Sequence, residues 1–555
     1  MPIQSGNPPD IITLNAWKGL NQQSKRGSID DEEEWWNENF FAIGPGNLRT
    51  CWGRGPVIYT APAGTLIWRM FFGFYGNQTP QFGAPPPGAM GWMFLSDGTI
   101  DEVDINTGQV TGLRAAGPTW GPATYPQLWA SAKVWRPAFV GSTLGQQGGV
   151  LFGSPAFTTS GGGPGGLYAW DGTTLSSPGE PAPDWLTDLA ETDPTAPIPD
   201  MPNGLPGIYG MEVYSSRLWV IGKDVVAFSA PSNGADFSTA NGGGSFGYFG
   251  DRLVYSFNDI QASAGYLYLF GDSSVDAINN VTLIGTPGQI ADPLTTDFNY
   301  FNVDPQVGQR FPRPCGRLGR YFTTFTGAGI SILQGGESVP ISDKVTNIWN
   351  TLDTSDYLPT FAPATMFGFR VMLANGRFTD PFGVTRSLLL MFHPTKGNEF
   401  WSVASQDIEL TQIGSYEQDS TLIPYGTDGQ SLFQLFAQPS QTLIKRLSSK
   451  QLRGAASKQQ SALTIKNAKR LYAEIADVSG LGVSMTGSVT SGGGGIPGGT
   501  ESVDFELTRG AQFGIIPAPL AGAGIWSAID LQSNSPDFVV ERLHLASEER
   551  TLFGA

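Results

Sequence analysis

The sequences RLWVIGKDVVAFSAPSNGADF, at Arg217–Phe237, and GYLYLFGDSSVDAI, at Gly265–Ile278, decide the fold class of this chain. In both, runs of four or five apolar, β-branched or aromatic residues alternate with short turns rich in Gly, Asp and Ser. This punctuation is typical of antiparallel strands joined by tight turns. A polar segment containing Pro and Gly, at 229–236, separates the first strand pair from the second. We therefore predict one blade of a β-propeller passing into the next.

The same pattern of strand, turn and strand recurs from residue 55 to residue 435. Asp-Gly dipeptides separate apolar runs at 97–98, 171–172 and 428–429, and such dipeptides favour two-residue hairpin turns because both central positions need a positive φ. Long Gly- and Pro-rich loops make the spacing irregular. The sequence predicts an all-β chain, an irregular β-propeller with long loop insertions plus a small C-terminal antiparallel β domain. An array of β-sandwiches is the alternative.

The composition favours many short strands over long helices. The 555 residues include 73 Gly and 41 Pro, which supply turns, and only 15% of the residues are charged. The 12% of aromatic residues suits packed sheets or an extensive protein interface. The N-terminus lacks the basic and apolar regions of a secretory signal, and no apolar run is long enough to span a membrane. We expect a soluble protein that is made in the cytoplasm.

The chain divides into four expected segments. Residues 1–54 are expected to form an N-terminal arm with a docking strand at Ile11–Leu14, and residues 55–440 the propeller with its insertions. Residues 441–470 carry basic side chains with no intervening acid and are expected to form a basic connector. Residues 471–555 alternate apolar and polar residues in several runs, which predicts the C-terminal β domain.

Two charged stretches are the candidate sites. The first is an acidic run that fits either the solvated first turn of a helix or an acidic patch at a lumen or subunit interface: Asp30, Asp31, Glu32, Glu33 and Glu34. The second lies in the basic connector and fits a solvated linker, a contact with an acidic neighbouring subunit, or a phosphate contact; its candidate contact residues are Lys445, Arg446, Lys450 and Arg453.

No catalytic constellation stands out in the sequence. The two histidines, His393 and His544, both lie inside strand-like apolar runs, where a structural position is expected. No nucleophile elbow, phosphate-binding loop or cluster with metal-ligand spacing accompanies them. The two cysteines, Cys51 and Cys315, are far apart and form no disulfide framework. We expect a protein that is not an enzyme and that has no cofactor and no metal.

The net charge narrows the class of partner. The formal charge is −17, and a surface this acidic repels the phosphates of nucleic acid. A role in gripping DNA is therefore disfavoured. An acidic channel would instead let DNA slide through without sticking.

Several stretches carry a resemblance to a known family. RLWV at Arg217–Val220 precedes VAFSAPSNGADF, which starts at Val226, and YLYLFGDSS follows at Tyr266–Ser274. This order resembles the centre of tail nozzle or tail tubular proteins, of the packaged-DNA stabilisation type, from short-tailed bacteriophages (podoviruses). In that family an R-L-x-V strand precedes a V-x-F-S-x-P segment ending in D-F, and an L-F-G-D-x-S strand follows. GLN at 19–21 and SPDF at 535–538 are similar to its opening and closing segments.

The resemblance implies a structural protein of the virion tail that is synthesised in the host cytoplasm. Identical subunits, expected to be six, would form a ring that continues the DNA channel below the portal and adaptor. The ring would retain packaged DNA and open for ejection, with tail fibres or a needle as further partners. Double-stranded DNA would pass through its lumen without sequence-specific binding, and no membrane insertion is implied.

Other functions remain open at this point. A tail-associated receptor-binding or glycan-degrading β-propeller is the main alternative, and it would need paired carboxylates beside aromatic residues in a groove. A periplasmic scaffold propeller is a third alternative, disfavoured by the missing secretory signal. The chain also departs from the phage family at Val275-Asp276, where that family usually has a bulky aromatic residue.

Overall fold

The computed structural model is built almost entirely from antiparallel strands. Within the residues that it describes, no helix is long and apolar enough to cross a membrane. The described residues are 10–30, 32–44, 46–74, 89–96, 99–112, 131–135, 149–153, 167–170, 175–176, 210–221, 225–232, 237, 239–247, 257–271, 274–286, 294–305, 308, 316–318, 321–326, 329–334, 337–394, 400–418, 420–452, 465–493, 500–509 and 514–550.

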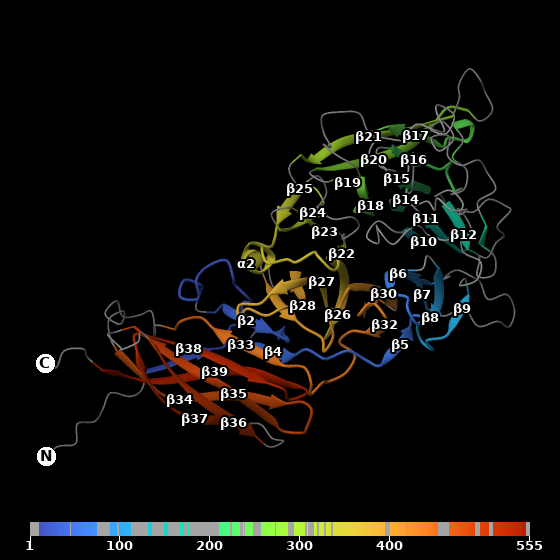
Figure 1. The fold of residues 1–555 in the computed structure, drawn as a ribbon. Helices are drawn as coiled ribbons and strands as arrows, with labels where there is room; N and C mark the ends of the chain where they lie inside the picture. The colour runs from blue at the N-terminus through green and yellow to red at the C-terminus, as the bar shows by residue number, and fades with distance from the viewer. Residues whose placement is uncertain are drawn as a thin grey trace, which may run out of the picture.

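Seven four-stranded units, counted over the described residues, follow one another around a ring (Figure 1). The first three blades are β6 (Ile67–Phe74), β7 (Ala89–Leu95), β8 (Ile100–Asp104) and β9 (Val110–Gly112); β10 (Ser131–Trp135), β11 (Gly149–Gly153), β12 (Leu167–Trp170) and β13 (Leu175–Ser176); and β14 (Gly210–Tyr214), β15 (Arg217–Ile221), β16 (Val225–Phe228) and β17 (Gly244–Gly247). The fourth and fifth are β18 (Phe257–Ser263), β19 (Tyr266–Gly271), β20 (Val275–Ile284) and β21 (Thr295–Asp304); and β22 (Gly316–Leu318), β23 (Tyr321–Phe325), β24 (Ile330–Gln334) and β25 (Glu337–Pro340). The sixth and seventh are β26 (Thr360–Met366), β27 (Phe369–Thr379), β28 (Thr385–Phe392) and β29 (Trp401–Ala404); and β30 (Gln412–Gln418), β31 (Thr421–Thr427), β32 (Ser431–Gln434) and β5 (Val57–Thr60).

The ring is a β-propeller, as the sequence predicts. For six of the seven pairs of neighbouring blades the first strands contact each other, β6 with β10, β10 with β14, β14 with β18, β22 with β26, β26 with β30, and β30 with β6. Blades four and five contact each other through β21 and β25. Residues 217–228 supply β15 and β16 of blade three, and residues 266–278 supply β19 and the first part of β20 in blade four. The buried Arg217 of blade three donates from Nη1 to the carbonyl oxygens of Ser229 and Gly242, at 2.8 and 2.7 Å.

Aromatic side chains fill the spaces between consecutive blades. Trp219 of blade three packs edge-to-face on Phe298 of blade four, with ring centroids 5.7 Å apart. Phe325 of blade five and Phe361 of blade six stack at 3.8 Å. Such pairs add to the stabilisation from buried area, so these aromatic side chains help to hold neighbouring blades together.

The ring closes by pairing strands from its two ends. β5 precedes blade one, yet it is the fourth strand of blade seven and pairs antiparallel with β32. This closure ties residues near position 58 to residues near position 432, so the ring cannot open at this blade without breaking ladder hydrogen bonds.

The C-terminal residues and the N-terminal strands build one β-sandwich. One sheet has the order β3 (Phe40–Gly44), β4 (Asn47–Thr50), β39 (Phe538–Arg550), β34 (Ile465–Asp477), β37 (Gly514–Gly524), with β1 (Asp10–Leu14) also paired to β39. The facing strands are β2 (Glu34–Glu38), β33 (Lys445–Ser449), β38 (Trp526–Ser533), β35 (Val483–Gly492) and β36 (Thr500–Arg509). Leu471 and Leu545 of the first sheet share a buried core with Met485 and Leu531 of the second.

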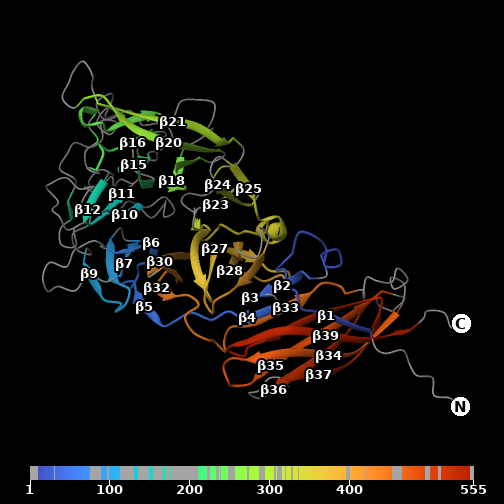
Figure 2. The same cartoon turned by 180° about the vertical axis from the view of Figure 1, so that it is seen from behind.

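The sandwich and the propeller share a sheet. Blade six continues from β29 through β2 and β33 into β38, β35 and β36, which makes nine strands. β2 lies parallel to β29 through Glu38 and Val403, and antiparallel to β33. Figures 1 and 2 show the propeller and the sandwich side by side, with this sheet between them.

Two of the expected segments have a different structure. Residues 10–54 supply β1 to β4 to the sandwich instead of forming a separate arm, although a docking strand does form at β1. The segment 441–470 is not a connector in its described part, because β33 is an interior strand of the nine-stranded sheet and β34 begins at Ile465. Local sequence patterns do not specify such long-range pairing.

An ion-pair network holds the sheet at this junction. The buried Glu38 of β2 accepts two hydrogen bonds from Arg386 of β28, at 2.7 and 2.9 Å. Arg386 also pairs with the buried Asp380 at 3.0 Å. Burial alone would lower the pKa of Arg386, but its bonds to Glu38 and Asp380 raise the pKa above the ordinary value.

Replacing Arg386 with Met should lower the free energy of unfolding by about 3–5 kcal/mol, because two buried carboxylates would lose their counter-ion. Arg370→Met is the matched control, since Arg370 and its partner Glu417 are both exposed, and it should cost less than about 1 kcal/mol. Urea unfolding followed by tryptophan fluorescence measures both. Equal losses for the two variants would contradict the role given to the network.

The closure of the ring can be tested at Gly108. This residue has φ +75°, and a Cβ there would lie 2.1 Å from the carbonyl oxygen of Ile58 in β5. Gly108→Ala should therefore destabilise the protein by about 2 kcal/mol or more, through strain and displacement of the closing strand. Gly64→Ala is the control, because its φ is also positive at +82° but its Cβ would meet nothing within 4 Å. In thermal unfolding, Gly108→Ala should have a clearly lower melting temperature than Gly64→Ala. The reverse order would contradict the pairing that closes the ring.

Candidate functional site

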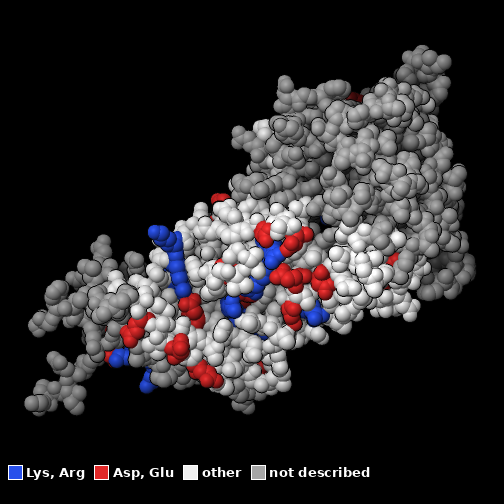
Figure 3. Space-filling model, in the orientation of Figure 1, with Lys and Arg blue, Asp and Glu red and all other residues white. Residues whose placement is uncertain are grey.

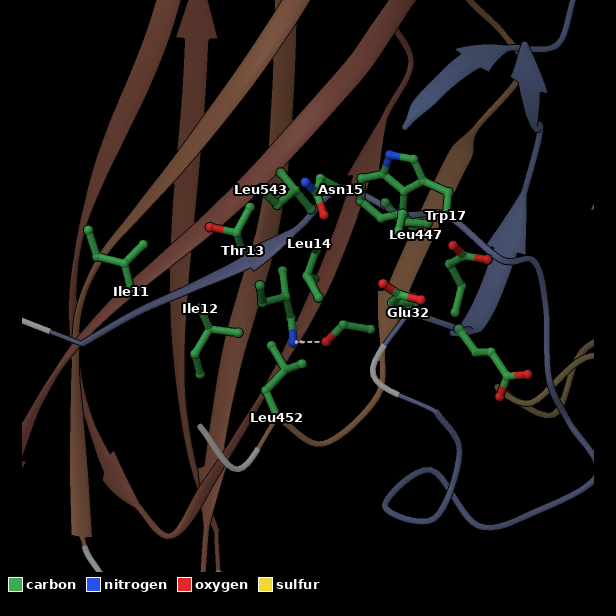
Figure 4. A pocket seen from close by; sticks show the side chains of 15 residues that line it. Ile11, Ile12, Thr13, Leu14, Asn15, Trp17, Glu32, Leu447, Leu452 and Leu543 are labelled. Atoms are coloured by element: carbon green, nitrogen blue, oxygen red, sulfur yellow. Dashed lines mark hydrogen bonds between the residues drawn. The ribbon is translucent and has the colours of Figure 1, made fainter. Parts of the chain in front are cut away.

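A cavity of about 270 Å³ lies in the sandwich where β1 crosses the edge of the strands β33 and β38 (Figure 4). Figure 4 shows apolar side chains of Ile12, Leu14 and Leu452 on one side and Glu32 on the other. The complete lining is Ile11, Ile12, Thr13, Leu14, Asn15, Ala16, Trp17, Glu32, Glu33, Glu34, Leu447, Ser449, Leu452, Ile529 and Leu543. The cavity thus combines apolar walls with three consecutive acidic residues.

Strand register places Glu34 on the cavity side of β2. Leu447 and Ser449 are two residues apart on β33, and both line the cavity. Glu34 is the cross-strand partner of Ser449, and Asn37 is the partner of Leu447. Directly paired residues project from the same face of a sheet, so Glu34 and Asn37 face the interior of the sandwich.

Glu34 is buried, and its carboxylate has no hydrogen-bonding partner in the part of the chain that the structure describes. Glu34 is only 2% exposed. Neither oxygen of its carboxylate has a hydrogen-bonding partner among the described residues. Burial raises the pKa of Glu34 to about 8, and the nearby Asn37 side chain and Gly19 backbone offset this effect only in part. The amide atoms of Asn37, itself fully buried, are likewise unsatisfied.

The remaining acids of the run have different surroundings. Asp30 and Glu32 are exposed and both pair with Lys18, at 3.4 and 2.5 Å. Glu33 is 8% exposed, pairs with Lys344 at 2.9 Å and accepts a hydrogen bond from Asn21. Burial alone would raise the pKa of Glu33, but the hydrogen bond from Lys344 and those from the Asp30 backbone and Asn21 hold it below the ordinary value.

The acidic run is therefore not one solvated patch. Asp30 and Glu32 fit the exposed part of the expected patch, Glu33 and Glu34 are buried, and Asp31 lies outside the described residues. No helix begins here, because Glu34 starts β2. The run is folded into the junction between β1, β2 and the short helical turn that carries Lys344, η4 (Asp343–Val345).

The expected basic contact is also used inside the chain. Lys445 is fully buried and its Nζ donates to the carbonyl oxygen of Ser440 at 2.6 Å. Burial lowers the pKa of Lys445 to about 8, although Cys51, Asp407 and Asp537 act in the opposite direction.

The other basic candidates are placed by the same strand. Lys450 donates to the carbonyl oxygen of Ile29 at 2.9 Å, and the guanidinium of Arg446 lies over the Phe382 ring at 5.4 Å. Arg453 lies outside the described residues. Lys445 is not available to a neighbouring subunit, and sequence analysis missed this because a lysine gives no local signal of burial.

Charges of both signs intermix on the face of the sandwich and junction drawn in Figure 3. One ion pair of the junction joins Arg26 to Asp530, whose carboxylate accepts from both Nη atoms of Arg26 at 3.1 and 2.8 Å. Arg49 of β4 similarly pairs with the buried Asp537 at 2.8 Å. Arg26 and Arg49 thus join the N-terminal part of the described chain to the C-terminal strands.

Both histidines have structural surroundings. His393 is buried and stacks on Phe41 with ring centroids 4.9 Å apart. His544 of β39 bridges two other strands, with Nδ1 2.9 Å from Thr13 Oγ1 and Nε2 3.1 Å from Glu474 Oε1. Within the described part of the chain, no group of three or more His, Cys, Asp or Glu side chains could hold a metal ion.

The comparisons with known proteins leave the function open. No protein-family model matches the chain, and no curated protein matches it. Solved structures with some likeness include BBS1N in complex with ARL6DN (TM-score 0.40, 8% identity, 70% of this chain and 97% of that one) and U3-55K (TM-score 0.35, 6% identity, 68% and 98%). The computationally designed Ika8 protein is another (TM-score 0.32, 10% identity, 69% and 100%). Likenesses this remote carry no argument about function, and the assignment of the propeller depends on its own strand order.

The burial of the Glu34 carboxylate can be tested through the pH dependence of stability. In the folded chain the pKa of Glu34 is about 8, above its ordinary 4.5, so ionisation costs stability as the pH rises from about 4.5 to about 8. Glu34→Gln removes that cost and should stabilise the protein by about 1–3 kcal/mol near pH 8.5, with the gain fading toward pH 4.5.

Urea unfolding at a series of pH values measures this difference. Glu32→Gln is the control, because Glu32 is exposed, and it should change stability by less than about 0.5 kcal/mol with no such trend. A Glu34→Gln variant that is less stable than the parent at high pH would contradict the buried, unpaired carboxylate.

Proposed function

We propose that this chain is a structural subunit of the tail nozzle of a short-tailed bacteriophage. Identical subunits, six in the simplest reading of the resemblance, form a ring below the portal and adaptor. The ring continues the DNA channel, retains the packaged DNA and opens for ejection. Its other neighbours in the virion tail are fibres or a needle.

The observation that carries the proposal is the nine-stranded sheet that joins the propeller to the sandwich. Two domains connected by one linker move relative to each other by default. Here β2 is hydrogen-bonded to β29 on one side and β33 on the other, and Arg386 binds Glu38 across the junction. A subunit of a tube needs this rigidity, because its two ends must keep their spacing while DNA is held under pressure.

The charge distribution supports the same role. Lys445, Lys450 and Arg26 each bind acceptors within the chain, which leaves fewer basic groups for phosphate. With a formal charge of −17, an assembled lumen would repel DNA and let it slide. The sequence segments that resemble the nozzle family form blades three and four and parts of the sandwich.

Electron microscopy of the purified full chain tests the proposal. Class averages should show closed rings with a central channel, and light scattering should give the mass of a small, fixed number of subunits. A short DNA duplex should not be retained by the ring at physiological salt, because binding to phosphate requires basic groups.

A stable monomer that releases sugar from host polysaccharide would overturn the nozzle and favour the glycan-degrading propeller. A stable monomer that binds intact host cells would instead favour the receptor-binding alternative.

A further inference from the structure

We propose that the cavity between the sheets of the sandwich binds an aliphatic ammonium group, with Glu34 as its counter-ion. This site is independent of the proposed nozzle function. Three observations lead to it: the size and walls of the cavity, the unsatisfied groups at its inner side, and the balance of charge around it.

The cavity fits a short aliphatic chain. Its volume of about 270 Å³ falls just below the range of pockets for drug-sized ligands, about 300–1,000 Å³, so it suits a ligand of a few heavy atoms. Ile12, Leu14 and Leu447 present apolar walls, which favour a hydrocarbon stem over a hydrated inorganic ion. Ile11 at its edge is 55% exposed, so the cavity is open to solvent on that side.

The inner side of the cavity has unsatisfied hydrogen-bonding groups. Buried polar atoms almost always have partners, yet the Glu34 carboxylate oxygens and the Asn37 amide have none among the described residues. The pairing of Glu34 with Ser449 and of Asn37 with Leu447 places both side chains on the same face. An ammonium group has three donors, so one placed in the cavity can donate to the carboxylate of Glu34, which is part of the lining.

The charges select a cation. Glu32, Glu33 and Glu34 line the acidic side of the cavity. Lys18 pairs with Glu32 and with the neighbouring Asp30, and Lys344 pairs with Glu33. Lys18 is held outside by two exposed carboxylates, and Lys344 by Glu33. Glu34 is left as the one acid of the described run without an ion pair, and an anionic ligand would be repelled.

Two sources present this chemistry. One is a lysine side chain of another polypeptide, whose four-carbon stem would lie along the apolar walls. The other is a free alkylamine. Both would place the nitrogen beside Glu34, so the tests include a probe for each.

Calorimetric titration of the full chain with n-butylammonium chloride near pH 7.5 is the first measurement. The ammonium ion should bind with a dissociation constant of about 1 mM or tighter, and the neutral analogue 1-butanol at least about tenfold more weakly, since only the cation gains a charged hydrogen bond. Glu34→Gln should weaken n-butylammonium about tenfold or more, and Glu32→Gln by less than about threefold.

A second variant fills the cavity and leaves Glu34 unchanged. Leu452→Trp places a larger side chain in the wall and should abolish binding of the amine. Thermal unfolding identifies variants that fail to fold. For Glu34→Gln, the expected gain in stability at high pH shows in addition that the variant is folded. Equal binding of n-butylammonium and 1-butanol, unchanged binding by Glu34→Gln, or no binding of the amine would each overturn the proposal.

A peptide with one central lysine and blocked termini identifies the source. Competition by this peptide at lower concentration than n-butylammonium, lost when its lysine is acetylated, would support a lysine of another polypeptide. Binding of n-butylammonium alone would support a free amine. Both results retain Glu34 as the counter-ion.

Discussion

The pairing of β2 between β29 and β33 is the constraint on which the rest of the structure depends. A strand of five residues joins blade six to the sandwich, and its hydrogen bonds on both edges make one sheet out of two domains. Its side chains serve both domains. Trp36 packs in the core between blades five and six, Glu38 binds Arg386, and Glu34 and Asn37 face the sandwich.

The same strand explains why a buried acid is tolerated. β2 begins within a run of acidic residues and ends within an apolar core. The chain therefore enters the interior at Glu34, the first residue of the strand. The network around Glu38 is fully paired, with Arg386, Ser405 and the Trp36 indole as donors. Among the described residues, no donor binds the carboxylate of Glu34. The same short strand thus carries a well-paired Glu38 and an unpaired, destabilising Glu34. Such a local cost to stability is expected where a residue has a role in binding and not in folding.

Local patterns in the sequence were enough to predict the class of fold. Short apolar runs separated by turns rich in Gly, Asp and Ser indicated blades three and four, and aromatic richness indicated packed sheets. The sequence did not indicate that Val57–Thr60 belongs to blade seven or that Lys445 is buried, because both follow from pairing between distant strands. The acidic run looked uniform in sequence, but strand register separates Glu32 at the surface from Glu34 inside. The cavity could not be predicted, since part of its wall comes from β1, which lies more than 400 residues before β33 and β39 in the chain.

The interleaving of the chain's two ends determines when the molecule can finish folding. β5 cannot pair until β32 is made, and about 370 residues of chain lie between them. At roughly 5–20 residues per second, the ribosome needs about 20–70 s to make that stretch. During this time the strands of the N-terminal segment have unpaired edges, and Trp35 and Trp36 lack their partners. Charged residues beside an apolar strand oppose aggregation, so the acids at 30–34 also protect the nascent chain while it waits for its C-terminal half.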